Sequence, residues 1–229
     1  MTDARTGVLA GLKVVVSAGP TFEDIDPVRF IGNRSSGKMG FAVAAAAAER
    51  GADVQLVAGP VALPTPPGVQ RIDVRSAAQM HEAVLAALPC DIYIGAAAVA
   101  DYTPREVAPG KLKKQVGQDT LTLELVRTPD ILAEVAAHAA RPRLVVGFAA
   151  ETDRVEHYAR GKLAAKRVDL IAANRVGVPG SGFESDDNAL TIYWDGGERA
   201  LGPAPKGELA RDLLDVVGRR LTGGAPGHG

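Results

Sequence analysis

The 229-residue sequence predicts an α/β protein built on a doubly wound, mostly parallel sheet with helices on both faces. β-branched runs and helical segments alternate through most of the chain, as successive right-handed β-α-β units require. Residues 91–100 form a nearly continuous apolar run, which indicates a strand buried on both faces of a parallel sheet. Hydrophobic residues make up 46% of the chain but aromatic residues only 4%, so small aliphatic side chains dominate the core.

The expected strands share short β-branched or apolar runs that end at glycine, proline or a polar residue. We expect them over residues 13–17, 53–58, 69–74, 91–100, 121–126, 144–148 and 169–173. Residues 189–194 and 198–201 flank an Asp-Gly-Gly sequence, which predicts a β-hairpin. The strand at 121–126, with the loop before it, predicts a small β extension or flap beside the main sheet.

The expected helices are amphipathic or Ala-rich segments with recognisable ends. We expect them over residues 38–51, 76–88, 129–140, 152–167 and 206–221. Gly51 ends the first helix as a C-terminal glycine does, and Ser76 is placed to cap the second. Pro129 stands near the first turn of the third helix, where its missing N–H costs nothing.

One domain is expected over residues 12–221, between a flexible leader (1–11) and a flexible tail (222–229). The net charge of −1 gives no basic excess for binding nucleic acid. Cys90 is the single cysteine, so no internal disulfide can form. No secretory leader is visible and the apolar run at 92–100 is too short to cross a bilayer. We therefore expect a cytoplasmic protein without membrane contact.

Polar and Gly-rich residues follow several expected strands at the point where each strand ends. These points come after residues 17, 58, 100, 148 and 173. Ligands of doubly wound sheets bind outside the carboxyl ends of the strands. The sequence therefore predicts one composite site at that edge of the sheet.

The segment from Gly32 to Met39 (GNRSSGKM) nearly matches the phosphate-binding pattern G-x-x-x-x-G-K-[ST]. Met39 replaces the hydroxyl residue that would hold magnesium, and the first strand ends well before the segment. Ser35, Ser36 and Gly37 instead stand at the start of the Ala-rich helix, where free N–H groups favour an anion. Plain capping of this helix by Ser36 is the alternative.

Other candidate contacts each have an ordinary structural alternative. The turn at 17–21 can hold phosphate oxygens on its N–H groups, or be an ordinary tight turn. Small residues at 95–97 let a ligand approach the backbone, and the following Asp101 can bind a base, ribose or ion, or cap a turn. Lys162 and Lys166 share one helical face, which is either a phosphate contact or a solvated surface.

Several function classes lack their motifs in this sequence. The four histidines and Cys90 show no metal-ligand spacing. The dinucleotide fingerprint G-x-G-x-x-G and the G-x-S-x-G elbow of serine hydrolases are absent.

Taken together, these segments resemble phosphopantothenoylcysteine synthetase, in many bacteria the C-terminal half of a bifunctional flavoprotein of coenzyme A biosynthesis. The matching stretches include SAGPTFEDIDPVRFIGNRSSGKMG, GAAAVADY, KLKK, RTPDIL, VGFAAET and GFESDDNAL, and cover nearly everything from residue 12 to 221. The resemblance implies a Rossmann-like fold and a homodimer. It also implies a ligase that uses CTP to activate 4'-phosphopantothenate as an acyl-cytidylate, which L-cysteine then attacks.

The resemblance also assigns residues to roles. The nucleotide contacts would be Gly95, Ala96, Ala97, Asp101, Lys111, Pro129, Asp130, Ile131, Leu132, Phe148, Lys162 and Lys166. The expected catalytic residues are Asn33, which would hold the acyl-cytidylate, and Lys111, on a flap (within the loop at 103–118) that would close on the triphosphate. Substrate contacts would come from Arg29, reaching the neighbouring subunit's site, and from Asn33, Ser35, Ser36 and Gly37. Mg²⁺ would accompany CTP, with ligands that the sequence does not define.

The flavin-dependent decarboxylase half is missing from this sequence, so we expect no flavin on the chain. It is either a stand-alone synthetase or a fragment of a bifunctional protein. Two other classes stay open: a nucleotide-dependent oxidoreductase on the same fold, and a non-catalytic nucleotide-binding module. Retention or reduction of NAD(P)H would identify the first, and CTP binding without pyrophosphate release the second.

Overall fold

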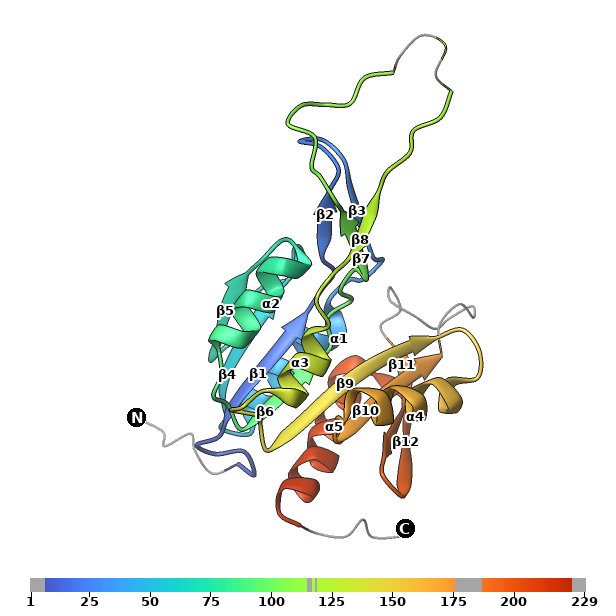
Figure 1. Ribbon diagram of the computed structural model, residues 1–229. Coiled ribbons are helices and arrows are strands. Elements are labelled where there is room, and N and C mark those ends of the chain that lie inside the picture. Colours follow the sequence, from blue (N-terminus) through green and yellow to red (C-terminus); the bar gives the residue numbers. More distant parts are fainter. Residues whose placement is uncertain (1–6, 115–116, 118, 176–186, 224–229) are drawn as a thin grey trace.

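The computed structural model describes residues 7–114, 117, 119–175 and 187–223. Its main sheet consists of β1 (Lys13–Ala18), β4 (Asp53–Ala58), β5 (Val69–Asp73), β6 (Ile92–Gly95), β9 (Leu144–Glu151), β10 (Leu170–Arg175), β11 (Asp187–Trp194) and β12 (Gly197–Pro205). The strand order is β12-β11-β10-β9-β6-β1-β4-β5 (Figure 1). The strands from β10 to β5 are parallel, and β11 and β12 complete one edge antiparallel. The predicted α/β architecture is confirmed.

Helices cover both faces of the sheet. On one face lie α1 (Lys38–Glu49) and α5 (Lys206–Leu221), and on the other α2 (Ala77–Ala86), α3 (Ile131–Ala137) and α4 (Val155–Lys166). Successive residues of β1 point to opposite faces, so Val14 and Val16 pack in one core and Val15 in the other. Both faces of the central strands are buried, which explains their uninterrupted apolar sequences.

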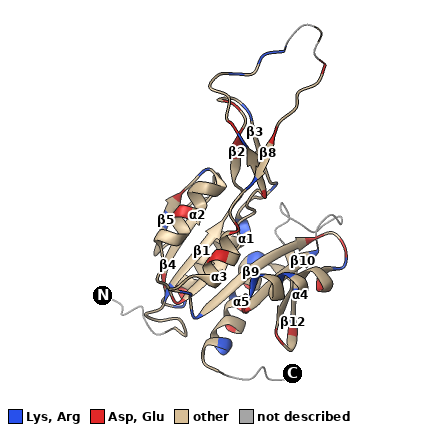
Figure 2. Cartoon of the chain, in the orientation of Figure 1, with Lys and Arg blue, Asp and Glu red and all other residues tan. Residues whose placement is uncertain are grey.

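An arm projects beyond the carboxyl ends of the parallel strands (Figure 1). It contains two antiparallel pairs: β2 (Phe22–Asp24) with β3 (Phe30–Gly32), and β7 (Tyr102–Pro104) with β8 (Leu125–Arg127). The described residues between β7 and β8 carry both basic and acidic side chains (Figure 2). We define the arm as residues 22–32 and the described residues among 102–127.

Several local expectations are confirmed. Ser76 caps α2 in a capping box, with its Oγ accepting from the Gln79 N–H at 3.2 Å. The hairpin at residues 195–197 joins β11 to β12.

Within the described part of the chain, no helix is long and apolar enough to cross a membrane.

The strand expected over residues 91–100 is much shorter, because β6 ends at Gly95. Beyond it the backbone turns to the loop after β1: the Ala98 N–H donates to the Gly19 carbonyl at 2.9 Å. The Ala100 N–H donates to the buried Thr21 Oγ1, also at 2.9 Å. Residues 96–99 are half-buried and line the cavities described below, so their apolar sequence reflects a loop at the site and led to the wrong strand boundary.

Other local predictions were also wrong. The strand expected at 121–126 is β8, over Leu125–Arg127, because only this stretch meets β7. The β2–β3 pair was not predicted. Helix α1 takes Gly37 as its N-cap, with φ 73°, which rules out the alternative of capping by Ser36. Leu9, assigned to the flexible leader, is fully buried in the core with α1 and α5. The outer limits of the domain stay a prediction.

Candidate functional site

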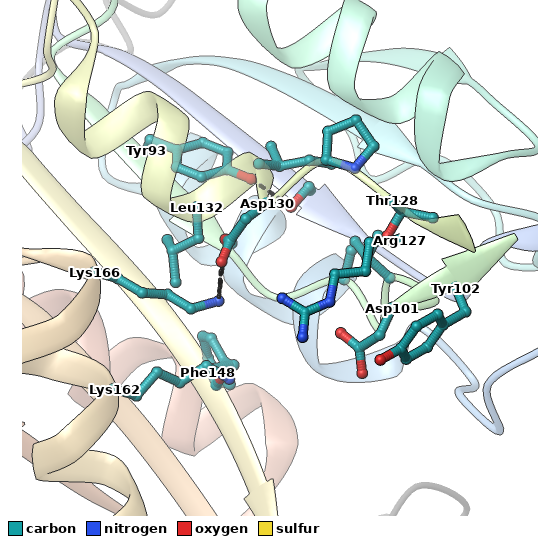
Figure 3. A pocket seen from close by; sticks show the side chains of 16 residues that line it. Tyr93, Asp101, Tyr102, Arg127, Thr128, Asp130, Leu132, Phe148, Lys162 and Lys166 are labelled. Atoms are coloured by element: carbon teal, nitrogen blue, oxygen red, sulfur yellow. Dashed lines mark hydrogen bonds and ion pairs between the residues drawn. The ribbon is translucent and has the colours of Figure 1, made fainter. Parts of the chain in front are cut away.

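Two adjoining cavities lie at the carboxyl ends of the parallel strands, where the sequence predicted a composite site. The first, of about 490 Å³, is lined by Ser17, Tyr93, Gly95, Ala97, Val99, Asp101, Tyr102, Arg127, Thr128, Pro129, Asp130, Ile131, Leu132, Phe148, Lys162 and Lys166. Figure 3 shows side chains from β6, β9, the start of α3 and one face of α4 converging on one space, together with Tyr102 of β7 and Arg127 of β8. Segments far apart in sequence thus build one chamber.

The floor of the first cavity is a pair of hydroxyl groups. Ser17 Oγ lies 3.0 Å from the Tyr93 hydroxyl, and both residues are buried. Burial raises the pKa of Tyr93 to about 12, so this phenol stays protonated at neutral pH. Leu132 and Phe148 add apolar surface beside the pair. The floor therefore suits the uncharged part of a ligand.

The open side of the first cavity carries the charges. Lys166 Nζ lies 2.9 Å from the carboxylate of Asp130, which also accepts the Ala133 N–H at 3.1 Å and so caps α3. The half-buried Lys162 donates to the Phe148 carbonyl at 3.0 Å. Burial, and next the neighbouring Lys166, lower the pKa of Lys162. Arg127 and Asp101 extend toward the same space in Figure 3.

The second cavity, of about 390 Å³, lies at the start of α1. Its lining comprises Asn33, Arg34, Ser35, Ser36, Gly37, Lys38, Met39, Gly40, Ala96, Ala97, Ala98, Val99, Asp101, Phe148, Ala149, Ala150, Lys162, Asn174, Asn188, Leu190 and Lys206. The left-handed backbone at Gly37 turns the chain into the helix, a conformation that favours glycine. Four of these side chains are cationic and one is a carboxylate, so the cavity favours anions.

Asn33 is held in one orientation at this cavity. Its Nδ2 donates to the carbonyl oxygens of Ala98 and Val99, at 3.2 and 3.0 Å. Because both neighbours are acceptors, the nitrogen must face them and the amide cannot be flipped. Oδ1 remains as the side-chain group that can meet a ligand, and it can only accept hydrogen bonds.

The two cavities share one wall. Ala97, Val99, Asp101, Phe148 and Lys162 line both of them. Ligands held in the two cavities would therefore come together over this wall.

Most residues singled out in the sequence line one or both cavities. Of the candidate turn at 17–21 only Ser17 is a lining residue, and Arg29 and Lys111, which lie on the arm, line neither cavity. Arg29 forms an ion pair with the buried Asp26 and donates to the Leu112 carbonyl at 2.8 Å. The arm therefore holds Arg29 against the segment that carries Lys111.

Other lining residues were missed by sequence reasoning. Tyr93 sat inside an apolar run, and Asn188 and Lys206 belong to segments distant in sequence from the other lining residues. For these missed residues the sequence offered one signal: Asn174 is a polar residue directly after the strand expected at 169–173. Among the described residues no group of three or more His, Cys, Asp or Glu side chains could hold a metal.

Fold and site together define a doubly wound α/β domain with two joined cavities, whose linings suit small anionic ligands. Residues 9–220 match the family of the DNA/pantothenate metabolism flavoprotein C-terminal domain, and the chain belongs to this family.

Curated relatives share about half of their aligned residues with this chain. The chain is 53% identical over 215 residues to the coenzyme A biosynthesis bifunctional protein CoaBC of Vibrio cholerae, covering 93% of this chain and 54% of that protein. The CoaBC protein of Escherichia coli K12 is 54% identical over 211 residues, covering 91% and 52%. The chain thus spans about half the length of these relatives.

Solved structures agree with the fold. The crystal structure of the C-terminal domain of a CoaBC protein superposes with a TM-score of 0.80 at 40% identity, covering 95% of this chain and all of that chain. A Cab2 mutant in complex with phosphopantothenate-cysteine gives a TM-score of 0.72 over 93% of this chain and 88% of that chain. Its identity is 16%, so this second likeness concerns the fold alone.

Proposed function

We propose that this domain is a phosphopantothenate–cysteine ligase, which joins 4'-phosphopantothenate to L-cysteine at the expense of CTP in coenzyme A biosynthesis. The observation that carries the proposal is the wall shared by the two cavities, with Lys162 and Asp101 on it. A ligase of this kind must bring a nucleotide phosphate and an acid together before an amine attacks. Family membership and the bifunctional CoaBC relatives support the same assignment.

The first cavity would hold the nucleotide. Its apolar and hydroxyl floor suits a base, and its cationic side, with Lys162 and Lys166, suits the phosphates. The Asp130–Lys166 ion pair would position the lysine before the ligand arrives. We retain CTP as the nucleotide from the family resemblance, since these contacts alone do not choose between bases.

The second cavity would hold 4'-phosphopantothenate. Ser35, Ser36 and Gly37, at the start of α1, offer an anion the positive end of a helix. The substrate carboxylate must reach the shared wall, because it has to attack the nucleotide held on the other side. The substrate would therefore lie along the cavity, with its carboxylate toward Lys162.

The reaction would proceed in two displacements. A carboxylate oxygen bonds to the α-phosphorus of CTP, the bond to the β-phosphate bridge breaks, and pyrophosphate leaves. The cysteine amine then attacks the acyl carbon of the acyl-cytidylate, the bond to the phosphate oxygen breaks, CMP leaves, and the amine loses a proton. Lys162 would stabilise negative charge in both steps, so positioning and electrostatics account for catalysis.

Asn33 would act in the second displacement. The attacking amine becomes positively charged and donates hydrogen bonds as its bond to carbon forms. Oδ1 of Asn33, oriented by the Ala98 and Val99 carbonyls, is an acceptor that could receive one of them.

Magnesium would be bound mainly by the triphosphate. The described side chains build no cage for it, and magnesium in nucleotide enzymes commonly takes one or two carboxylates together with phosphates. Asp101, on the shared wall, is the carboxylate we assign to it. When bound, the ion would neutralise charge on the leaving pyrophosphate.

A homodimer would complete the site. The arm exposes apolar side chains that a monomer has no reason to present, with Val28, Phe30, Val107 and Leu121 each 45–59% exposed. Arg29, on the same arm, would then reach the partner's cavity, and Lys111 would close over a triphosphate. Both assignments come from the family resemblance and stay predictions.

The chain covers about half of its bifunctional relatives, which supports native fusion to a flavin-dependent decarboxylase. The flavin would belong to that other part, and none is expected here. A cytoplasmic location stays a prediction.

The test is pyrophosphate release from the purified domain with Mg²⁺, 4'-phosphopantothenate and CTP, with and without cysteine. Sustained release and CMP formation on addition of cysteine are expected. Release with ATP but not CTP would keep the reaction and reject the nucleotide. CTP binding without release would identify a binding module, and NAD(P)H turnover an oxidoreductase.

A further inference from the structure

The backbone of Ala100 is held on both sides by threonine hydroxyl groups. Its N–H donates to the Thr21 Oγ1 at 2.9 Å, and its carbonyl accepts from the Thr128 Oγ1 at 2.6 Å. Ala100 and Thr21 are buried, so these backbone groups depend on the threonines as their partners. The Thr128 N–H also donates to the Asp101 carbonyl, at 3.0 Å. Thr128 therefore holds two successive carbonyl groups of the loop after β6.

The two threonines lie where the arm joins the sheet. Thr21 comes directly before β2, Thr128 directly after β8, and Asp101 directly before β7. Three segments that are distant in sequence are thus joined at one point by these hydrogen bonds. Figure 3 shows Thr128 and Asp101 on one side of the first cavity, with Lys162 and Lys166 on the other.

The position of Asp101 depends on its backbone. Among the residues drawn in Figure 3, none forms a hydrogen bond or an ion pair with the Asp101 carboxylate, which lies on the wall shared by the two cavities. That carboxylate influences the lysine on the same wall. Burial has the largest effect on the pKa of Lys162 and lowers it, whereas the negative charge of Asp101 favours the protonated lysine.

We infer that Thr128, together with Thr21, positions Asp101 on the shared wall and thereby supports nucleotide binding. The inference rests on the proposed function, in which the nucleotide lies in the first cavity. The hydroxyl proton of Thr128 is directed at the Ala100 carbonyl, so Thr128 acts on the ligand through Asp101 and is a positioning residue. Without the hydroxyl, the buried Ala100 carbonyl would lose its donor, and a shift of the backbone toward another donor would move Asp101 as well.

The experiment is a double-mutant cycle on the Kd of CTP, measured by calorimetry with Mg²⁺ present. It compares the wild-type domain with Thr128→Val, Asp101→Ala and the double variant. Valine keeps the shape of threonine and removes the hydroxyl, and Thr128→Ser retains a hydroxyl at this position. Thr222→Val is the matched control, because the Thr222 Oγ1 also donates to a backbone carbonyl, that of Arg219 at 3.1 Å, but lies at the end of α5 and lines neither cavity.

Thr128→Val should raise the Kd of CTP by about 10-fold, the size expected for the loss of one hydrogen bond made by a charged group. In the Asp101→Ala background the same substitution should change the Kd by less than about twofold, because the residue through which it acts is gone. Thr128→Ser and Thr222→Val should bind CTP as the wild type does. No loss in Thr128→Val, an equal loss in both backgrounds, or a Thr128→Ser variant as weak as Thr128→Val would overturn the inference.

A second measurement needs no ligand. Hydrogen exchange of the Ala100 amide, followed by NMR, should become faster in Thr128→Val and stay unchanged in Thr222→Val. Unchanged exchange in Thr128→Val would overturn the inference even if CTP binding fell. A wild-type domain that does not bind CTP would reject the nucleotide of the proposed function, and the exchange rates would still decide whether Thr128 holds the loop. Circular dichroism checks folding, and Thr128→Ala replaces Thr128→Val if the latter does not fold.

Discussion

The side-chain nitrogen of Asn33 donates a 3.0 Å hydrogen bond to the backbone carbonyl of Val99. This bond joins the segment before α1 to the loop after β6, and it forces the Asn33 side chain to present its oxygen to the second cavity. An asparagine held in this way recognises a donor such as an amine. It cannot donate hydrogen bonds to an oxyanion, because its donors face backbone carbonyls.

Asn33→Ala should slow the cysteine step by about 10–100-fold, because one hydrogen bond to a charged group is lost. Pyrophosphate release without cysteine should stay normal, and the acyl-cytidylate should accumulate. Quenched reactions separated by chromatography would measure both. Loss of pyrophosphate release would instead assign Asn33 to the first step.

The titration of Lys162 should make the pH profile of kcat/KM for CTP fall on its alkaline side, and this fall is the alkaline limb of the profile. Burial, followed by Lys166, lowers the pKa of Lys162 in the folded protein, so its charge disappears below the usual lysine pKa of about 10.4. The value of kcat/KM for CTP should therefore fall as the pH rises through this lowered pKa. Lys162→Arg should remove the limb, because arginine stays charged.

Over the same pH range the free energy of unfolding should rise, whereas kcat/KM falls. Between the lowered pKa and that of the unfolded chain, the unfolded state binds more protons at Lys162, so stability from this group rises with pH. Chemical denaturation of wild type and Lys162→Met at several pH values would measure this. A kcat/KM profile that follows stability would show that the alkaline limb reflects unfolding instead.

Asp26 should control the attachment of the arm. The buried carboxylate accepts hydrogen bonds from the N–H groups of Val28 (2.8 Å) and Leu112 (3.1 Å), besides its ion pair with Arg29. Asp26→Asn should make the Leu112 amide exchange faster with solvent hydrogen. Asp24→Asn is the matched control, because Asp24 pairs with Arg75 at the surface of the same hairpin and should have little effect.

The contact between Asp26 and the Leu112 segment of the arm should also persist at acidic pH. The Arg29 side chain holds the pKa of Asp26 well below its usual range. A depressed aspartate pKa stabilises the folded state above the unfolded pKa of about 4, and this stabilisation is lost only as the pH falls toward the lowered value. Leu112 protection that disappears already near pH 4 would contradict this account.

Two glycines in helices should respond oppositely to alanine. A Cβ at Gly40 in α1 would lie 2.5 Å from the Cβ of Ala18 in β1, so Gly40→Ala should cost about 1–3 kcal/mol by overpacking. A Cβ at Gly161 in α4 would meet nothing within 4 Å, so Gly161→Ala should stabilise by about 0.5–1 kcal/mol. Denaturant unfolding would measure both changes.

Much of the fold was predictable because its strands and helices have strong local patterns. The β-branched runs of β1 and β4 and the Ser76 capping box depend on nearby residues alone. The end of β6 was not predictable, because the residues at 96–99 line the cavities from a loop but are as apolar as those of a buried strand. The β2–β3 pair was missed for a related reason, since three-residue strands leave little pattern.

The sequence by itself determined the fold class, the family resemblance and the candidates that line the cavities, because these depend on local patterns and their order along the chain. Only the tertiary structure decided that Asn33 presents an oxygen, that Lys162 belongs to both cavities, and that Lys206 faces the second. The physical reason is that cavity walls, burial and hydrogen-bond partners come from segments far apart in sequence. The folded sheet brings these segments to one edge, and no local pattern records which side chains meet there.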